Sequence, residues 1–167
     1  MKTKYCILFA GVPGSSKSPI AHHIGWNLGL PAFNNDTLRS EVKEDTLEYD
    51  VPEYERRRDE RAEQLLDKGQ PFIYDASIDR SWGKFSHKLK DRGYEYFIIS
   101  LDPSRERIEK IYKSKEYDWL DKLDQWQSEH DAFLAEYGDE VGIYIRDEDF
   151  SRRLDIGLRA VKDWIEG

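Results

Sequence analysis

Residues 5–18 read Tyr-Cys-Ile-Leu-Phe-Ala-Gly-Val-Pro-Gly-Ser-Ser-Lys-Ser, a short apolar run followed directly by a turn rich in glycine and serine. The apolar run is typical of a buried strand, and the residues from Lys17 onward have the pattern of a helix. A glycine-rich turn in this position can direct its backbone N–H groups around phosphate oxygens, and the helix adds its positive N-terminal end. The stretch therefore predicts a phosphate-binding loop (P-loop).

Six residues of this turn are candidates for holding the phosphates of a nucleotide: Gly11, Gly14, Ser15, Ser16, Lys17 and Ser18. Lys17 would reach the β- and γ-phosphates, and Ser18 would place its hydroxyl on Mg²⁺. The alternative is a tight turn between a strand and a helix with a solvated lysine.

The turn departs from the usual pattern G-x-x-x-x-G-K-[S/T] at Ser16, which stands where the second glycine belongs. We expect Ser16 to crowd the phosphates or to strain the backbone. Pro19 is a second departure, because the residue after the Ser/Thr usually offers its N–H to the α-phosphate and proline has none. Both departures predict weak nucleotide binding for a loop of this kind.

The rest of the chain alternates short apolar runs with longer periodic segments. Apolar runs at 5–10, 31–33, 71–74, 94–101 and 142–145 predict strands, and segments at about 17–28, 37–48, 53–68, 81–92, 104–137 and 150–165 predict helices. This alternation predicts parallel βαβ units in a three-layer α/β domain over residues 1–167, with about five strands and helices on both faces. The long segment 104–137 would form a helical lid with a break near residues 114–118.

Composition excludes several other classes of protein. The net charge of −8 argues against an extensive nucleic-acid surface, and no apolar stretch approaches the roughly 20 residues of a membrane span. The single Cys6 excludes a disulfide framework and is typical of a reducing compartment, so we expect a cytoplasmic protein that does not bind membranes. The sequence carries no signal for an oligomeric state.

Two further blocks accompany the P-loop. One is Asn35-Asp36-Thr37-Leu38-Arg39, and the other is the run 72–77 with Arg80 downstream, followed later by 94–103. With the P-loop, these blocks resemble the small P-loop kinases grouped with polynucleotide 5′-kinase, zeta toxins and related AAA-type predicted kinases, over about residues 4–115. The resemblance implies an ATP- and Mg²⁺-dependent kinase in which Asp36 is the catalytic base and Arg39 holds a phosphate.

The order of strands and helices also predicts a ligand site beside the P-loop. Ligands of open α/β sheets bind beyond the carboxyl ends of the strands, and Lys17, Asp36 and Asp75 each follow or end a predicted strand. Asp75 would hold Mg²⁺ directly or through water. Alternatively, Asp36 only caps the next helix and Asp75 caps a turn.

Kinases of this type usually bring arginines from the lid to the transferring phosphoryl group. The cations near the expected lid are Arg105, Arg107, Lys110, Lys113 and Lys115, and no arginine occurs from 108 to 145. Lysine supplies charge without the bidentate fork of arginine. In such kinases the loop after the fifth strand often meets the base, so the resemblance places Arg146 or Arg152 against adenine.

The leading hypothesis is therefore an ATP-dependent phosphotransferase that moves the γ-phosphoryl group to a hydroxyl of a small molecule or of a nucleotide or nucleic-acid end. The alternative is a degenerate P-loop protein that binds nucleotide or another anion without transferring phosphate. A third hypothesis is an interaction domain that uses exposed Trp119 and Trp126.

Overall fold

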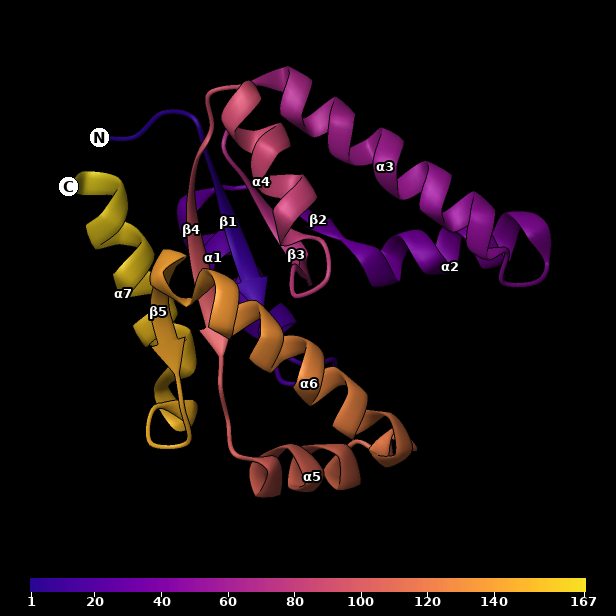
Figure 1. The fold of residues 1–167 in the computed structure, drawn as a ribbon. Helices are drawn as coiled ribbons and strands as arrows, with labels where there is room; N and C mark the ends of the chain where they lie inside the picture. The colour runs from indigo at the N-terminus through magenta and orange to yellow at the C-terminus, as the bar shows by residue number, and fades with distance from the viewer.

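The five strands of the computed structural model, which describes residues 1–167, form one parallel sheet in the order β2-β3-β1-β4-β5 (Figure 1). Their bounds are β1 Tyr5–Ala10, β2 Ala32–Asn34, β3 Phe72–Ser77, β4 Glu95–Leu101 and β5 Val141–Ile145. The expected five-stranded parallel α/β architecture is confirmed. Strand β1 lies in the centre of the sheet, so the loop that follows it lies at the middle of the carboxyl edge.

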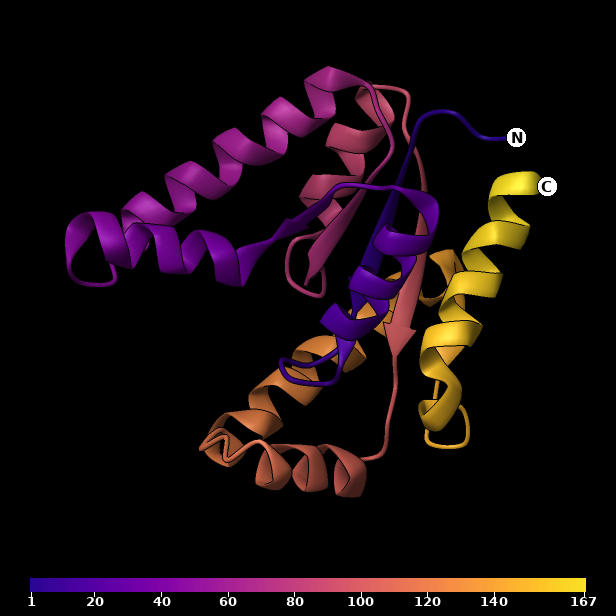
Figure 2. The same ribbon diagram turned by 180° about the vertical axis from the view of Figure 1, so that it is seen from behind.

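Seven α-helices accompany the sheet: α1 Lys17–Leu28, α2 Asn35–Thr46, α3 Val51–Lys68, α4 Trp82–Asp91, α5 Arg105–Ser114, α6 Leu120–Tyr137 and α7 Arg153–Glu166. Short 3₁₀ helices span Gly138–Glu140 and Phe150–Arg152. Helices α1 and α7 cover one face of the sheet, as Figure 2 shows, and α3, α4 and the C-terminal half of α6 cover the other. No helix combines the length and the apolar composition that crossing a bilayer requires.

The surroundings of strand β1 explain why its sequence has no alternation of polar and apolar residues. Every one of its residues is buried. Ile7 and Phe9 pack against α1 and α7, whereas Cys6 and Leu8 pack in the core on the opposite face. A strand covered on both faces has to be apolar at every position.

The segment 104–137 divides where a break was expected. Helix α5 ends at Ser114 and α6 begins at Leu120, and Glu116 in the turn between them has a positive φ of 56°. Helix α5 and the N-terminal half of α6 lie beyond the carboxyl edge of the sheet (Figure 1) and enclose a small core of their own around Ile108, Tyr112 and Leu123. Val12 of the P-loop belongs to this same core, so the helical pair packs directly on the loop.

Candidate functional site

The P-loop occupies the turn between β1 and α1 and uses three positive φ angles. Gly11 has φ 132°, Gly14 has φ 75°, and Ser16 has φ 82° with ψ 32°. Ser16 therefore takes the left-handed conformation that glycine adopts without cost, at a strain of roughly 1–2 kcal/mol. Of the two expected effects of Ser16, the structure has the backbone strain.

Lys17 is folded back into the P-loop. Its Nζ donates to the carbonyl oxygens of Gly11 and Val12 at 2.8 and 2.6 Å, with the Ser15 hydroxyl at 3.4 Å. Burial lowers the pKa of Lys17 to about 8, and the nearby carboxylates of Asp79, Asp75 and Asp36 oppose that shift. Lys17 is thus a cation with neutral hydrogen-bond partners, placed where an anion would stabilise its charge.

Asp75 lies next to Ser18. The Ser18 hydroxyl donates to one carboxylate oxygen of Asp75 at 3.1 Å, and the Asn34 amide donates to the other at 2.6 Å. The pairing of β1 with β3 shifts register here, since Leu8 pairs with Tyr74 but Phe9 pairs with Ser77. Such irregularities re-aim side chains beside active sites.

The donor set around Asp75 suits Mg²⁺. Burial raises the pKa of Asp75, although the hydrogen bonds from Asn34 and Ser18 and the nearby Lys17 oppose that shift. One carboxylate and one hydroxyl, completed by phosphate oxygens and water, form a usual ligand set for this ion. The residues present therefore fit the predicted metal, and they form no site of three or more His, Cys, Asp or Glu side chains.

Asp36 and Arg39 lie on the first turns of α2 and line a cleft together with the P-loop. The helix begins at Asn35, two residues earlier than expected, because the Asn34 side chain caps it by accepting from the backbone N–H groups of Asp36 and Thr37. The alternative in which Asp36 is the cap is therefore wrong. Its carboxylate is 81% exposed and is bound by Arg39 at 3.0 Å.

A cleft of about 390 Å³ joins these groups and is called the P-loop cleft here. Its walls come from the P-loop, the first turns of α2, the end of β3 and the turn between α5 and α6. Lys17, Ser18, Asp36, Arg39 and Asp75 all line it. Residues far apart in the sequence thus converge at the carboxyl edge of the sheet, as the strand order predicted.

The lid presents only part of its charge to this cleft. Arg105 is paired with Glu109 and Asp124, Arg107 with Asp147, and Lys110 with Glu106. Lys115 makes no ion pair and lines the P-loop cleft. It shares the cleft with Lys17, and its charge adds to the lowering of the pKa of Lys17 that burial causes.

Aromatic side chains of the lid lie against the P-loop. The Tyr112 hydroxyl donates to the carbonyl oxygen of Pro13, and the rings of Tyr117 and Trp119 stack with centroids 4.0 Å apart. A Cβ at Gly14 would lie 2.9 Å from the Tyr112 ring, so this packing requires glycine. Trp126 packs edge-on against Trp119 at 5.8 Å. Both tryptophans are partly buried in the core of the lid, whereas the interaction-domain hypothesis expected them to be exposed.

Sequence reasoning missed a buried network behind the loop. The backbone N–H of Gly11 donates to Asp79, whose carboxylate also contacts Nδ1 of His130 at 3.1 Å. The other ring nitrogen of His130 contacts Asp102 at the end of β4. Burial favours the neutral imidazole, but the bonds to Asp102 and Asp79 outweigh it and raise the pKa of His130 to about 9. A protonated His130 thus ties α6 to the start of the P-loop.

The placement of Arg146 or Arg152 against the base stays a prediction. Arg146 is exposed and stacks over the Tyr144 ring at 5.1 Å, and Arg152 is exposed in the 3₁₀ turn before α7. Arg153 of the same cluster contacts the P-loop, with Nε donating to the Ser16 hydroxyl at 3.0 Å. The sequence showed a basic cluster here but not which member turns inward.

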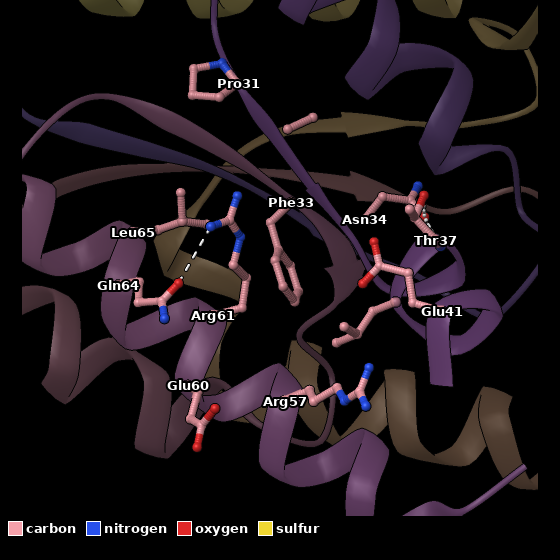
Figure 3. Close-up of a pocket in the computed structure, with 12 residues that line it drawn as sticks. Pro31, Phe33, Asn34, Thr37, Glu41, Arg57, Glu60, Arg61, Gln64 and Leu65 are labelled. Carbon is pink, nitrogen blue, oxygen red and sulfur yellow. Dashed lines mark hydrogen bonds between the residues drawn. The ribbon is translucent and has the colours of Figure 1, made fainter. Parts of the chain in front are cut away.

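A second cavity, of about 360 Å³, lies between β2, α2 and α3 (Figure 3). Phe33 lies at its centre, and Arg61 donates to Gln64 at its edge. None of the predicted site residues lines it. Asn34 lines this cavity and its amide donates to Asp75, which lines the P-loop cleft, so one hydrogen bond links the two cavities.

No protein-family model matches the chain, and neither does any curated protein. Several solved structures do. A gluconokinase from Sinorhizobium meliloti 1021 has a TM-score of 0.65 at 16% sequence identity, over 99% of this chain and 96% of that chain. Shikimate kinase from Aquifex aeolicus has a TM-score of 0.59 at 14% identity, over 97% and 99% of the two chains. The APS kinase of Mycobacterium tuberculosis, in complex with AMPPNP and APS, has a TM-score of 0.52 at 21% identity, over 74% and 77%.

This protein has the P-loop kinase fold. All three structures are P-loop kinases. At such low identity the likeness concerns the fold alone, and one fold serves many substrates.

Proposed function

We propose that this protein is an ATP- and Mg²⁺-dependent phosphotransferase of the group that includes polynucleotide 5′-kinase and zeta toxins. It would move a γ-phosphoryl group to a hydroxyl of a small molecule or of a nucleotide end. The observation that carries the proposal is the convergence of Lys17, Ser18, Asp75 and Asp36 on one cleft. A phosphate site, a metal-ligand pair and a candidate base are the parts that phosphoryl transfer needs.

Each side chain has a distinct role in this proposal. Lys17 leaves its carbonyl partners and neutralises the β- and γ-phosphates, and Lys115 adds a second positive charge from the lid. Ser18 and Asp75 hold Mg²⁺, which supplies charge neutralisation on the phosphates when bound. Asp36 orients the acceptor hydroxyl and accepts its proton, and Arg39 holds that carboxylate and a neighbouring phosphate. Catalysis rests on positioning and electrostatics.

A second function has specific observations in its favour. Ser16 is strained, Pro19 lacks an N–H, and Arg105 and Arg107 are already paired with carboxylates. A loop with these departures suits a protein that binds a nucleotide or another anion without transferring phosphate. ATP binding without turnover on any acceptor would favour this function.

Two measurements test the proposal. Calorimetric titration with ATP and Mg²⁺ establishes binding, and Lys17→Ala should weaken it by about 2 kcal/mol, as expected for a charge-assisted contact. A screen of phosphate transfer from labelled ATP to nucleosides, sugars, small alcohols and 5′-hydroxyl oligonucleotides then identifies the acceptor. No ATP binding by the wild type would refute the phosphotransferase and would leave only the binding of another anion.

The role of Asp36 is tested separately with the acceptor identified by that screen. Asp36→Asn keeps the shape of the side chain but removes the proton acceptor, so turnover should fall by roughly 10²–10⁴-fold while ATP affinity is retained. Glu44→Gln is the matched control, because Glu44 is an exposed carboxylate on the same helix that does not line the P-loop cleft. A loss of less than about tenfold in Asp36→Asn would exclude Asp36 as the base.

A further inference from the structure

Arg153 is a half-buried cation without a carboxylate partner. Its Nε donates to the Ser16 hydroxyl at 3.0 Å, and its Nη1 donates to the carbonyl oxygen of Phe150 at 2.9 Å. Burial lowers its pKa, and no acidic group counteracts that shift. Other arginines near this edge, such as Arg105 and Arg107, are paired with carboxylates. An unpaired cation beside a phosphate loop is poised for an anion, because burying such a charge alone is costly.

The guanidinium of Arg153 also has N–H donors without a hydrogen-bond partner. An arginine carries five N–H donors in a planar fork, and the two hydrogen bonds of Arg153 use two of them. The face of Phe150 lies 4.4 Å from the guanidinium carbon and fixes the plane of the group. Three N–H groups are therefore held in a defined orientation next to the P-loop.

The packing of α7 against α1 places Arg153 beside the start of α1. The two helices are in close contact, and a Cβ on Gly157 of α7 would lie only 2.8 Å from Ile20 of α1. Ile20 directly follows Pro19, and Gly157 lies one turn after Arg153. The approach of Gly157 to Ile20 and the hydrogen bond from Arg153 to Ser16 therefore place the first turn of α7 beside the first turn of α1, where the N–H that normally meets the α-phosphate is missing.

We infer that Arg153 is a ligand of the nucleotide phosphates and replaces the contact that Pro19 cannot make. The two departures of the P-loop are then linked, because the Ser16 hydroxyl, absent from a glycine, orients the guanidinium that substitutes for the missing N–H of Pro19. The ligand class is a polyphosphate, as in a nucleoside di- or triphosphate. The inference rests on the proposed function for the identity of the nucleotide, but it concerns binding and not transfer.

Calorimetry with Mg²⁺ and ATP, ADP, tripolyphosphate or adenosine tests this inference. Arg153→Gln should weaken binding of the three phosphate-bearing ligands by tenfold or more, since a hydrogen bond to a charged group is lost. Binding of adenosine should not change. Arg159→Gln is the matched control, because Arg159 is exposed on the same helix and should leave every affinity unchanged. Arg153→Lys keeps the positive charge but loses the bidentate guanidinium, so the loss of affinity should be smaller. This variant provides the test if Arg153→Gln does not fold.

Two double-mutant cycles test the link with the loop. Pro19→Ala restores an N–H, so Arg153→Gln should cost less affinity in that background than in the wild type. Ser16→Gly should weaken ATP binding only when Arg153 is present. Equal affinities of Arg153→Gln and wild type for ATP would overturn the inference, and so would equal losses for ATP and adenosine, which indicate a contact with the base. If ATP binding depends on Lys17 but not on Arg153, only this inference fails; if wild type binds neither ATP nor tripolyphosphate, the proposed function fails too.

Discussion

His130 should make the stability of this protein depend on pH in the alkaline range. Its imidazole is 2% exposed and lies between the carboxylates of Asp79 and Asp102, which raise its pKa to about 9. In the unfolded chain the pKa of a histidine is about 6.5. A raised pKa stabilises the fold fully below pH 6.5, and that contribution declines as the pH rises through about 9. The difference corresponds to about 3 kcal/mol in the free energy of unfolding.

The variant His130→Gln isolates this contribution. Urea unfolding at intervals from pH 6 to pH 9.5 gives the free energy of unfolding of the variant and of the wild type. The gap between the two should shrink by about 3 kcal/mol across that range, since the imidazolium is lost from the wild type. Lys17, whose pKa is lowered to about 8, acts in the opposite direction above that pH, but it is present in both proteins and cancels in the difference.

His87→Gln is the matched control, because His87 is exposed on α4 and makes no ion pair. Its gap to the wild type should stay small and independent of pH. A gap for His130→Gln that is constant from pH 6 to pH 9.5 would refute the reasoning, because it would mean that the two carboxylates do not hold a proton on the imidazole.

Three further predictions concern the loop and its lid. Gly14→Ala should lower the free energy of unfolding by about 1–3 kcal/mol more than Gly29→Ala. Both glycines have a positive φ, but only a Cβ at Gly14 would meet the Tyr112 ring, at 2.9 Å. Equal losses in urea unfolding would contradict this prediction. Tyr112→Phe removes the hydrogen bond to Pro13 and should cost about 1 kcal/mol with a shift of tryptophan fluorescence from the lid, and an unchanged spectrum would argue against the contact. Asp75→Asn should abolish the Mg²⁺ dependence of ATP affinity in calorimetry without lowering stability, because burial already disfavours the charge of this carboxylate. A retained Mg²⁺ dependence would exclude Asp75 as a ligand.

The fold and the position of the P-loop could be read from local sequence. The run 5–10 is apolar at every position because the central strand is covered on both faces, and Gly11 and Gly14 mark the turn because positive φ angles are needed there. Helix boundaries were less exact, as α2 shows, since its start depends on the Asn34 side chain rather than on apolar periodicity. The convergence of Asp36 and Asp75 on the loop followed from the rule that parallel strands end at one edge.

The partners of the charged side chains were decided by tertiary structure alone. Arg153 and Ser16 are 137 positions apart, and His130 is 51 from Asp79 and 28 from Asp102. No local pattern encodes such pairs, because they form only when helices from different parts of the chain pack on the same edge of the sheet. The sequence by itself determined that a phosphate loop follows a central strand. Packing determined which cations remain unpaired beside it, since the energy of a charge depends on burial and on neighbours that only the folded chain brings close.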